Sequence, residues 1–193
     1  MLNKLNLKYQ TDIGGGVFYG PEIDIKIKDS LGREWQCTTI QVDFNLPERF
    51  KITYIDKKGI KKAPIMIHRA LLGSLERFIG VLIEHYAGNF PVWLSPIQAW
   101  VIPVGSGHRK YAGEVAETLK EHGLRVELKD TAETVSKKIR DGETQKLPYM
   151  LIVGSKEMKT KSVGVRQRKK GDIGIMKLTK FIEKVKTEIE KSK

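Results

Sequence analysis

The sequence predicts a mixed α/β protein of two domains. Residues 1–90 are expected to form part of an antiparallel sheet with one long helix, and residues 91–193 a small α/β domain with a mixed sheet. Hydrophobic and polar residues alternate along two N-terminal segments, and apolar residues then recur at helical spacing. After residue 97, strand-like and helix-like segments alternate. The change of pattern separates the two domains.

Two strands are expected at residues 22–28 and 35–44, because both segments alternate with a period of two. Residues 30–33 provide the turn of an antiparallel hairpin. Gln36 and Gln41 lie on the second strand, and a spacing of five places them on opposite faces of an ideal strand. Both can face one ligand only if a bulge or a bend lies between them.

A solvated loop over residues 56–62 is expected to precede a helix over residues 70–87, which ends at Gly88. Ser74 and Arg77 share one face of that helix, and His68 immediately precedes it. These polar residues gather at the N-terminal end of the helix, where free backbone donors and the helix dipole favour anions.

The second domain is expected to begin at Pro91, where two prolines bracket a short segment, Pro91 to Pro96. Four strands are predicted at residues 98–104, 125–129, 148–153 and 162–168. Three helices are predicted at residues 110–122, 133–140 and 178–191. This alternation implies a parallel or mixed sheet covered by helices.

The composition limits the classes of partner and location. Lysine and arginine number 35 against 23 acidic residues, a net charge of +12. Nucleic acid is therefore a plausible partner, although a solvated basic surface explains the charge equally well.

The single cysteine, Cys37, excludes an internal disulfide framework, and we expect a buried, inert thiol. No apolar run is long enough for a membrane span and Met1 to Asn6 is too polar for a signal peptide, which favours the cytoplasm without membrane contact.

Three long motifs resemble the C-terminal half of the catalytic domain of bacterial-type threonyl-tRNA synthetases, which are class II synthetases. They are VFYGPEIDIKIKD at residues 17–29, REWQCTTIQVDFNLPERF at residues 33–50 and IHRALLGSLERFIG at residues 67–80. The region after Pro91 is similar to the anticodon-binding domain of the same family, most clearly in PYMLIVGSKE and VGVRQR. The resemblance extends over essentially all 193 residues.

The resemblance implies an ATP site. The third motif matches the third class II signature, so Arg77 would be the catalytic arginine that contacts the ATP phosphates. A guanidinium suits this task because it is permanently charged and offers a planar fork of donors. Ser74 would contact the ligand from the same face, Gln36 would contact the nucleotide, and Mg²⁺ would accompany ATP.

The resemblance also implies a threonine pocket with Tyr19 and Gln41, in which His68 would be one of three zinc ligands. The zinc would bind the amino group and the hydroxyl of threonine. A site that must ligate a hydroxyl rejects valine, which a hydrophobic pocket alone separates poorly from threonine.

Each assignment has a structural alternative. A histidine beside a helix is usually a satisfied structural residue, and an arginine on a helix is more often a surface or ion-pair residue. Tyr19 and the two glutamines would otherwise be ordinary strand residues. Three motifs in family order favour the functional interpretation of Arg77, His68 and Gln36. Residues 14–16, three glycines, do not match a P-loop and are interpreted as a flexible turn.

In the second domain, Glu157 and Arg166 lie where the family reads anticodon bases. The structural alternative is a solvated turn and a charged strand end. The sequence departs from the family nearby, because Thr131, Ala132 and Thr134 stand where the family usually shows Arg, Asn and Lys. We expect this loss of two cations and an amide to weaken contact with the anticodon.

The first two class II signatures and two of the three zinc ligands have no counterpart in the sequence, so we expect the chain to begin within a catalytic domain. Activity of the chain alone and tight zinc binding are then not expected. The hairpin and helix would also expose a sheet edge and apolar faces.

Three hypotheses follow. The leading one is a C-terminal part of a threonine–tRNA ligase, which in its complete, homodimeric form activates threonine with ATP and transfers it to tRNA(Thr). The alternative is a non-catalytic tRNA- or RNA-binding module, which would bind with steep salt dependence and no dependence on ATP or threonine. A ligand-sensing regulatory protein, which would bind threonine without forming the adenylate, is the third.

Overall fold

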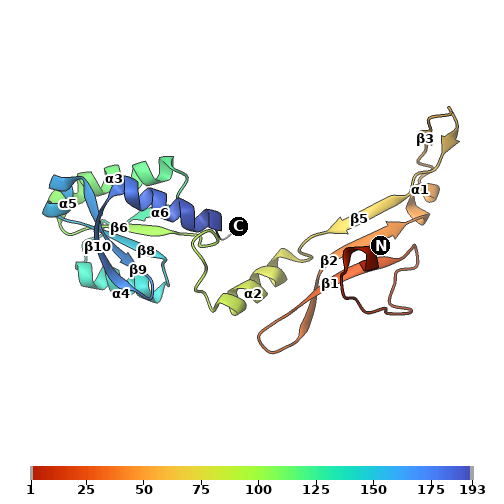
Figure 1. Cartoon of the computed structure of the whole chain (residues 1–193), viewed down its shortest axis with the longest axis horizontal. Coiled ribbons are helices and arrows are strands. Elements are labelled where there is room, and N and C mark those ends of the chain that lie inside the picture. The colour runs from red at the N-terminus through yellow and green to blue at the C-terminus, as the bar shows by residue number, and fades with distance from the viewer. Residues whose placement is uncertain (1, 192–193) are drawn as a thin grey trace. The chain divides into compact units, whose positions relative to one another are not determined.

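The computed structural model describes residues 2–191, and the chain divides into two compact units, Met1–His85 and Tyr86–Lys193 (Figure 1). Each unit has its own sheet. The mixed α/β class predicted from the sequence is confirmed, with an antiparallel sheet in the first unit and a mixed sheet in the second.

The sheet of the first unit has three antiparallel strands in the order β1-β2-β5. The strands are β1 (Glu22–Lys28), β2 (Glu34–Asp43) and β5 (Met66–Ala70). The predicted hairpin between β1 and β2 is confirmed. Its turn is closed by hydrogen bonds from Asp29 N to Arg33 O at 3.0 Å and from Gly32 N to Asp29 O at 3.0 Å. Gly32 has a φ of 79°, which a residue without a Cβ adopts readily.

The predicted helix over residues 70–87 is wrong at its start. Ala70 is the last residue of β5, and helix α2 covers Leu75–Tyr86. Pairing of β5 with β2 holds residues 66–70 extended, and Gly73, with a φ of 63°, lies outside the helical region. Gly88 follows the end of α2 with a φ of 72°, in accordance with the predicted stop.

Several short elements of the first unit were not predicted. Part of the expected loop over residues 56–62 is paired in a two-stranded ribbon, whose turn Asp56 stabilises through hydrogen bonds to the backbone N–H groups of Lys58 and Ile60. The ribbon strands are β3 (Tyr54–Ile55) and β4 (Lys61–Lys62). The remaining short elements are a 3₁₀ helix η1 (Leu2–Leu5) and α1 (Asn45–Arg49).

The sheet of the second unit has the strand order β10-β9-β8-β6-β7. The first three strands along the chain are parallel: β6 (Ala99–Pro103), β7 (Val126–Leu128) and β8 (Tyr149–Val153). Two antiparallel strands extend the sheet: β9 (Ser162–Gln167) and β10 (Gly171–Lys177). The helices are η2 (Ser106–His108), α3 (Arg109–Glu121), α4 (Val135–Thr144), α5 (Ser155–Thr160) and α6 (Leu178–Lys191). Of these elements, η2, α5 and β10 were not predicted.

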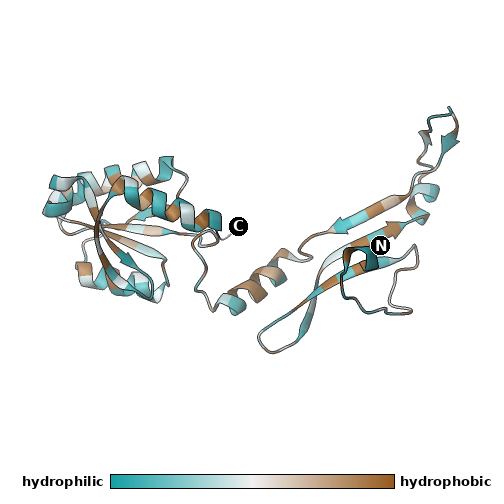
Figure 2. Cartoon of the chain, viewed as in Figure 1, coloured by the Kyte–Doolittle hydropathy of each residue, from teal (hydrophilic) through white to brown (hydrophobic). Residues whose placement is uncertain are grey.

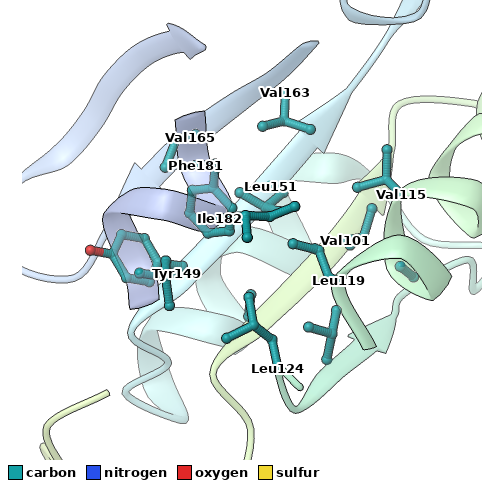
Figure 3. Packing of buried hydrophobic residues seen from close by; sticks show 14 of the residues in the cluster. Val101, Val115, Leu119, Leu124, Tyr149, Leu151, Val163, Val165, Phe181 and Ile182 are labelled. Carbon is teal, nitrogen blue, oxygen red and sulfur yellow. The ribbon is translucent and has the colours of Figure 1, made fainter. Parts of the chain in front are cut away.

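The core of the second unit occupies both faces of its sheet. Val101 and Leu151 are fully buried on one face with residues of α3 and α6, as Figure 3 shows. Trp100 and Met150, their neighbours along β6 and β8, pack on the other face with Val135 and Ile139 of α4. Consecutive strand residues point to opposite faces, so both faces of this sheet are covered by helices.

The first unit buries far less. Among its described residues, Cys37 is the only buried hydrophobic residue, and its thiol is free, as predicted. Helix α2 has no buried residue: Leu75 is 60% exposed and Ile79 is 51% exposed. Figure 2 shows that α2 is rich in hydrophobic residues, and their exposure agrees with the exposed apolar faces expected from the sequence. None of the described helices is long and apolar enough to cross a membrane.

Candidate functional site

A β-bulge in β2 brings the two glutamines onto one face of the sheet. The register with β1 passes from Ile25 opposite Thr38 to Lys26 opposite Gln36, so Cys37 is an additional, unpaired residue. Nε2 of Gln36 consequently donates to Oδ1 of Asp24 at 2.6 Å and to Oγ1 of Thr39 at 2.9 Å. Thr39 and Gln41 are two apart and share this face. The bulge that the spacing of the glutamines required is therefore present.

The residues expected in the threonine pocket lie together on the same face. Gln41 of β2 is directly opposite His68 of β5. Tyr19 donates from its hydroxyl to Oε1 of Gln41 at 2.8 Å, and Nε2 of Gln41 donates to Oε2 of Glu22 at 2.8 Å. The rings of Tyr19 and His68 meet edge to face with centroids 6.0 Å apart.

Tight packing of the backbone fixes the position of Tyr19. A Cβ at Gly20 would lie 1.8 Å from the carbonyl oxygen of Val42, closer than any real contact. The segment bearing Tyr19 therefore lies directly against β2 only because residue 20 is glycine. The hydrogen bonds from Val42 N to Pro21 O and from Phe44 N to Tyr19 O, at 3.0 and 3.2 Å, secure this approach.

His68 is held by a buried carboxylate that the sequence reasoning missed. Nε2 of His68 lies 2.8 Å from Oδ2 of Asp43, which has no exposed surface. Oδ1 of Asp43 accepts from the backbone N–H groups of Asn45 at 2.7 Å and Leu46 at 3.0 Å. Burial raises the pKa of Asp43, but the hydrogen bonds from His68 and from these two N–H groups outweigh it and lower the pKa.

The residues present do not by themselves fit a zinc ion. The bond to Asp43 occupies Nε2 of His68 and leaves Nδ1 as the nitrogen able to ligate. Residues 2–191 contain no group of three histidine, cysteine, aspartate or glutamate side chains placed to hold a metal. Zinc sites use three or four protein ligands, so the described residues supply too few.

Ser74 and Arg77 lie at the start of α2, beside β2. Oγ of Ser74 accepts from the backbone N–H of Arg77 at 3.3 Å and donates to Glu76 at 2.8 Å, so Ser74 caps the helix. The guanidinium carbon of Arg77 lies 5.2 Å from the ring centroid of Trp35. Trp35 immediately precedes Gln36 in β2, and the two side chains point to opposite faces.

In the second unit, Glu157 lies next to the part of β9 to which Arg166 belongs. Oε2 of Glu157 accepts from the backbone N–H of Gly154 at 2.9 Å and thereby caps α5. Its Oε1 lies 4.0 Å from where a Cβ at Gly164 would be, and Gly164 is two residues from Arg166 on the same face of β9. A Cβ at Gly164 would also lie 3.3 Å from the carbonyl oxygen of Ile152, so the absence of a side chain there allows this close packing next to Glu157.

Arg166 lines a cavity of about 370 Å³. Its guanidinium forms a weak ion pair with Glu143 at 3.5 Å, and its Nε is buried without a hydrogen-bond partner among the described residues. Arg168 and Lys169 also line this cavity, which is therefore predominantly basic.

Thr131, Ala132 and Thr134 line a second cavity of about 300 Å³, at the ends of β6 and β7. Thr134 caps α4 by accepting from the backbone N–H of Lys137 at 3.3 Å, and Thr131 donates to Glu133 at 3.2 Å. Arg109 and the buried Lys138 also line this cavity. Thr134 thus stabilises the start of a helix, and Thr131 bonds a neighbouring side chain.

Some of the missed residues carried a signal in the sequence. Asp43 lies two residues after Gln41 and Asp24 two residues after Glu22, so the period of two already placed them on the polar face. The contact between Trp35 and Arg77 joins residues 42 positions apart and had no local signal.

The chain matches two protein-family models. Residues 1–86 match the tRNA synthetase class II core domain (G, H, P, S and T), and residues 98–188 match the anticodon-binding domain. Together with an antiparallel sheet followed by a separate mixed α/β unit, these matches define the family of class II aminoacyl-tRNA synthetases.

Relatives of similar sequence show which aminoacyl-tRNA synthetase family the chain resembles. The chain is 53% identical over 188 residues to a threonine–tRNA ligase of Caldanaerobacter subterraneus subsp. tengcongensis, a match that covers 97% of this chain and 29% of the relative. A second threonine–tRNA ligase, from Carboxydothermus hydrogenoformans, is 53% identical over 192 residues, and the match covers 100% of this chain and 30% of that relative. The crystal structure of the RNA-binding domain of threonyl-tRNA synthetase from Cryptosporidium parvum superposes with a TM-score of 0.86 at 39% identity, covering 96% of this chain and 47% of that one.

The chain therefore belongs to the threonyl-tRNA synthetase family. It spans about 30% of the length of these two curated relatives.

Proposed function

We propose that this chain acts within a threonine–tRNA ligase that activates threonine with ATP and transfers it to tRNA(Thr). The observation that carries the proposal is the bulge at Cys37, because it gathers Gln36, Gln41 and His68 onto one polar face beside Tyr19. A strand without the bulge would divide these residues between two faces.

In this proposal Arg77 holds the ATP phosphates, Ser74 lies beside it at the helix start, and Gln36 contacts the nucleotide. Arg77 is a permanent cation at the N-terminal turn of α2, where the backbone dipole also favours an anion. Mg²⁺ would accompany the ATP phosphates. Adenylation requires the threonine carboxylate to attack the α-phosphate in line, so the contribution of Arg77 is positioning and charge stabilisation.

Tyr19, Gln41 and His68 are proposed to hold threonine. Because Gln41 bonds both Tyr19 and Glu22, its amide is oriented before a ligand arrives. We propose zinc only for a site that His68 shares with ligands outside residues 2–191, and the roles given to the other residues do not depend on it.

Glu157 and Arg166 are proposed to read anticodon bases. A carboxylate oxygen can accept from a base amino group, and the Arg166 guanidinium can donate to or stack on a base. The basic cavity beside Arg166 and the position of Glu157 next to the same strand support this assignment. Thr131, Ala132 and Thr134 are proposed to weaken the contact relative to other family members.

We further propose that the catalytic portion covers residues 1–90 and the anticodon-binding domain residues 91–193. The two family matches leave residues 87–97 unassigned, and the proposed boundary lies within that interval. A cytoplasmic homodimer without membrane contact is the proposed form of the complete enzyme.

The first test restores the rest of the enzyme in trans and measures threonine-dependent exchange of pyrophosphate into ATP. Arg77→Ala is expected to lower the exchange rate about 100-fold, the usual effect of removing one charge-stabilising donor. His68→Ala is expected to raise the threonine concentration needed for half-maximal exchange. Arg69→Ala is the matched control, because Arg69 is an exposed arginine next to His68 on β5.

If Arg77→Ala and His68→Ala restore the same exchange as the unaltered chain, the site assignment is wrong. Binding of tRNA(Thr) tests the second unit separately. Arg166→Ala is expected to weaken binding at every salt concentration, whereas Lys186→Ala, a change at an exposed lysine of α6, should have a small effect.

One observation favours the alternative of a non-catalytic RNA-binding module. The second unit has its own complete core on both faces of its sheet, while the first has almost none. RNA binding with a steep salt dependence, unaffected by ATP and threonine and without restored exchange, would support this alternative.

A further inference from the structure

The indole ring of Trp35 contacts two guanidinium groups. The guanidinium carbon of Arg77 lies 5.2 Å from the ring centroid, and that of Arg33 lies 5.6 Å from the same centroid. Both distances are within the range in which the ring quadrupole attracts a cation. Arg33 comes from the hairpin and Arg77 from α2, so the ring joins two elements that are distant in sequence.

A buried carboxylate fixes the orientation of this ring. Nε1 of Trp35 donates to Oδ2 of Asp29 at 2.9 Å, and the same oxygen accepts from Nε of Arg33 at 2.6 Å. Oδ1 of Asp29 accepts from the backbone N–H groups of Leu31 at 3.0 Å and Arg33 at 2.9 Å. Asp29 is 9% exposed, and three bonds, from Leu31 N, Arg33 N and Arg33 Nε, anchor it to the turn. The indole cannot rotate about its Cα–Cβ bond without breaking the bond to Asp29.

Two further contacts join the hairpin to α2 and to the segment that precedes it. Oγ1 of Thr38 donates to the carbonyl of Leu71 at 2.5 Å, and Ser30 at the hairpin turn bonds Glu84 near the end of α2. Glu84 is seven residues after Arg77, so both lie on the helix face that meets the hairpin. Arg77 near the start of this face and Glu84 near its end therefore both contact the hairpin.

We infer that Trp35 is a positioning residue for Arg77, which it holds in a restricted set of rotamers with the planar fork free for phosphate oxygens. The inference rests on the proposed role of Arg77. An arginine side chain on an exposed helix turn loses rotamer freedom when it binds a ligand, and a stacked guanidinium has already lost part of it. Asp29 acts on Arg77 only indirectly, because its hydrogen bond sets the orientation of the Trp35 ring.

The first experiment uses the chain itself and NMR spectroscopy. Ring currents of Trp35 are expected to move the Arg77 side-chain protons upfield, and Trp35→Leu should return them to the values of a solvated arginine. Trp93→Leu is the matched control, since Trp93 is a partly exposed tryptophan of the other unit and its loss should leave Arg77 unchanged. Unshifted Arg77 protons in the unaltered chain would overturn the inference.

The second experiment uses the enzyme restored in trans and separates KM for ATP from KM for threonine. Trp35→Leu is expected to raise KM for ATP about tenfold while KM for threonine stays constant, because only the phosphate clamp is misplaced. Trp35→Phe keeps a ring face but loses the N–H that Asp29 fixes, and a rise of about threefold is expected. This milder variant covers the case in which Trp35→Leu does not fold.

The double variant separates the possible failures. If Trp35 acts through Arg77, Trp35→Leu adds no further loss to Arg77→Ala. Additive losses would overturn the inference and leave the proposed role of Arg77 intact. If Arg77→Ala itself leaves exchange unchanged, the proposed role of Arg77 and the inference fail together, even where NMR shows the stacked arginine.

Discussion

Hydrophobic residues are buried in the second unit of this chain and largely exposed in the first. Leu151 and Val101 of the second unit are fully buried, whereas Leu75 and Ile67 of the first are 60% and 65% exposed. Burial of a leucine contributes about 1.5–3 kcal/mol, so the second unit is stabilised by its core. The first unit must rely on its sheet hydrogen bonds and on polar side-chain networks.

Those networks are well organised but bring modest stability. Asp24, Gln36 and Thr39 form one set of bonds, and Asp43 and His68 form another. A typical hydrogen bond contributes about 1 kcal/mol net. The difference between the units shows that the side chains of a candidate site can be well ordered even where few buried contacts stabilise the fold that carries them. In this chain the polar face of the first unit is arranged without a core beneath it.

Hydrogen exchange should show the largest difference between the units. Amides of β6 and β8 are expected to exchange only through global opening of the second unit, with a free energy of about 5 kcal/mol or more. Amides of β1 and β2 should open at a cost at least about 3 kcal/mol lower, because few buried contacts oppose opening. Exchange measured by mass spectrometry on the intact chain tests this, and equal protection of both sheets would contradict the comparison.

A pair of identical substitutions tests the core directly. Leu151→Ala should lower the free energy of unfolding of the second unit by about 2–5 kcal/mol, because it leaves a cavity among fully buried side chains. Leu75→Ala should change stability by no more than about 0.5 kcal/mol, since that side chain is largely exposed. Urea denaturation of both variants measures the difference. A loss above about 1 kcal/mol for Leu75→Ala would show that α2 packs against a partner in solution.

One position of the first unit should be as intolerant as a core residue. Gly20→Ala places a Cβ 1.8 Å from the Val42 carbonyl, so the backbone must move and Tyr19 should lose its bond to Gln41. We expect a loss of about 1–3 kcal/mol in the stability of the first unit. Gly16→Ala is the control, because its Cβ would have an ordinary contact at 3.8 Å. Exchange of the amides of β2 measures both, and equal effects would contradict the tight packing.

The sequence predicted the elements that local patterns encode. The alternation at residues 22–28 and the helical spacing up to Tyr86 correspond to β1 and to most of α2. The start of α2 was wrong because Ala70, Leu71 and Leu72 fit the helical spacing, whereas pairing with β2 makes Ala70 the last residue of a strand and residues 71–74 form bends before the helix. Such pairing between distant segments leaves no periodic signal in a short window.

The candidate site was predictable by residue but not by geometry. The resemblance named Gln36, Gln41 and His68, and the spacing of the glutamines showed that a bulge was needed. The sequence did not reveal that Cys37 is the bulged residue, because a bulge depends on the register of the partner strand. The contacts of Trp35 were not predictable either, because its partners come from the hairpin turn and from α2.

The smallest expected effect is a pH dependence confined to the hairpin turn of the first unit. The hydrogen bond from Trp35 is the main cause that lowers the pKa of Asp29 to about 2 from its ordinary value of 3.8, with further bonds from Arg33 and Leu31. A lowered pKa in the folded state stabilises the fold above the unfolded value, so this contribution is complete above pH 4 and is lost as the pH falls toward 2. The Trp35 indole N–H signal in NMR spectra should move over that range, while Asp29→Asn should remove the transition. A wild-type signal that stays constant down to pH 2, or the same transition in Asp29→Asn, would show that Asp29 does not hold the ring.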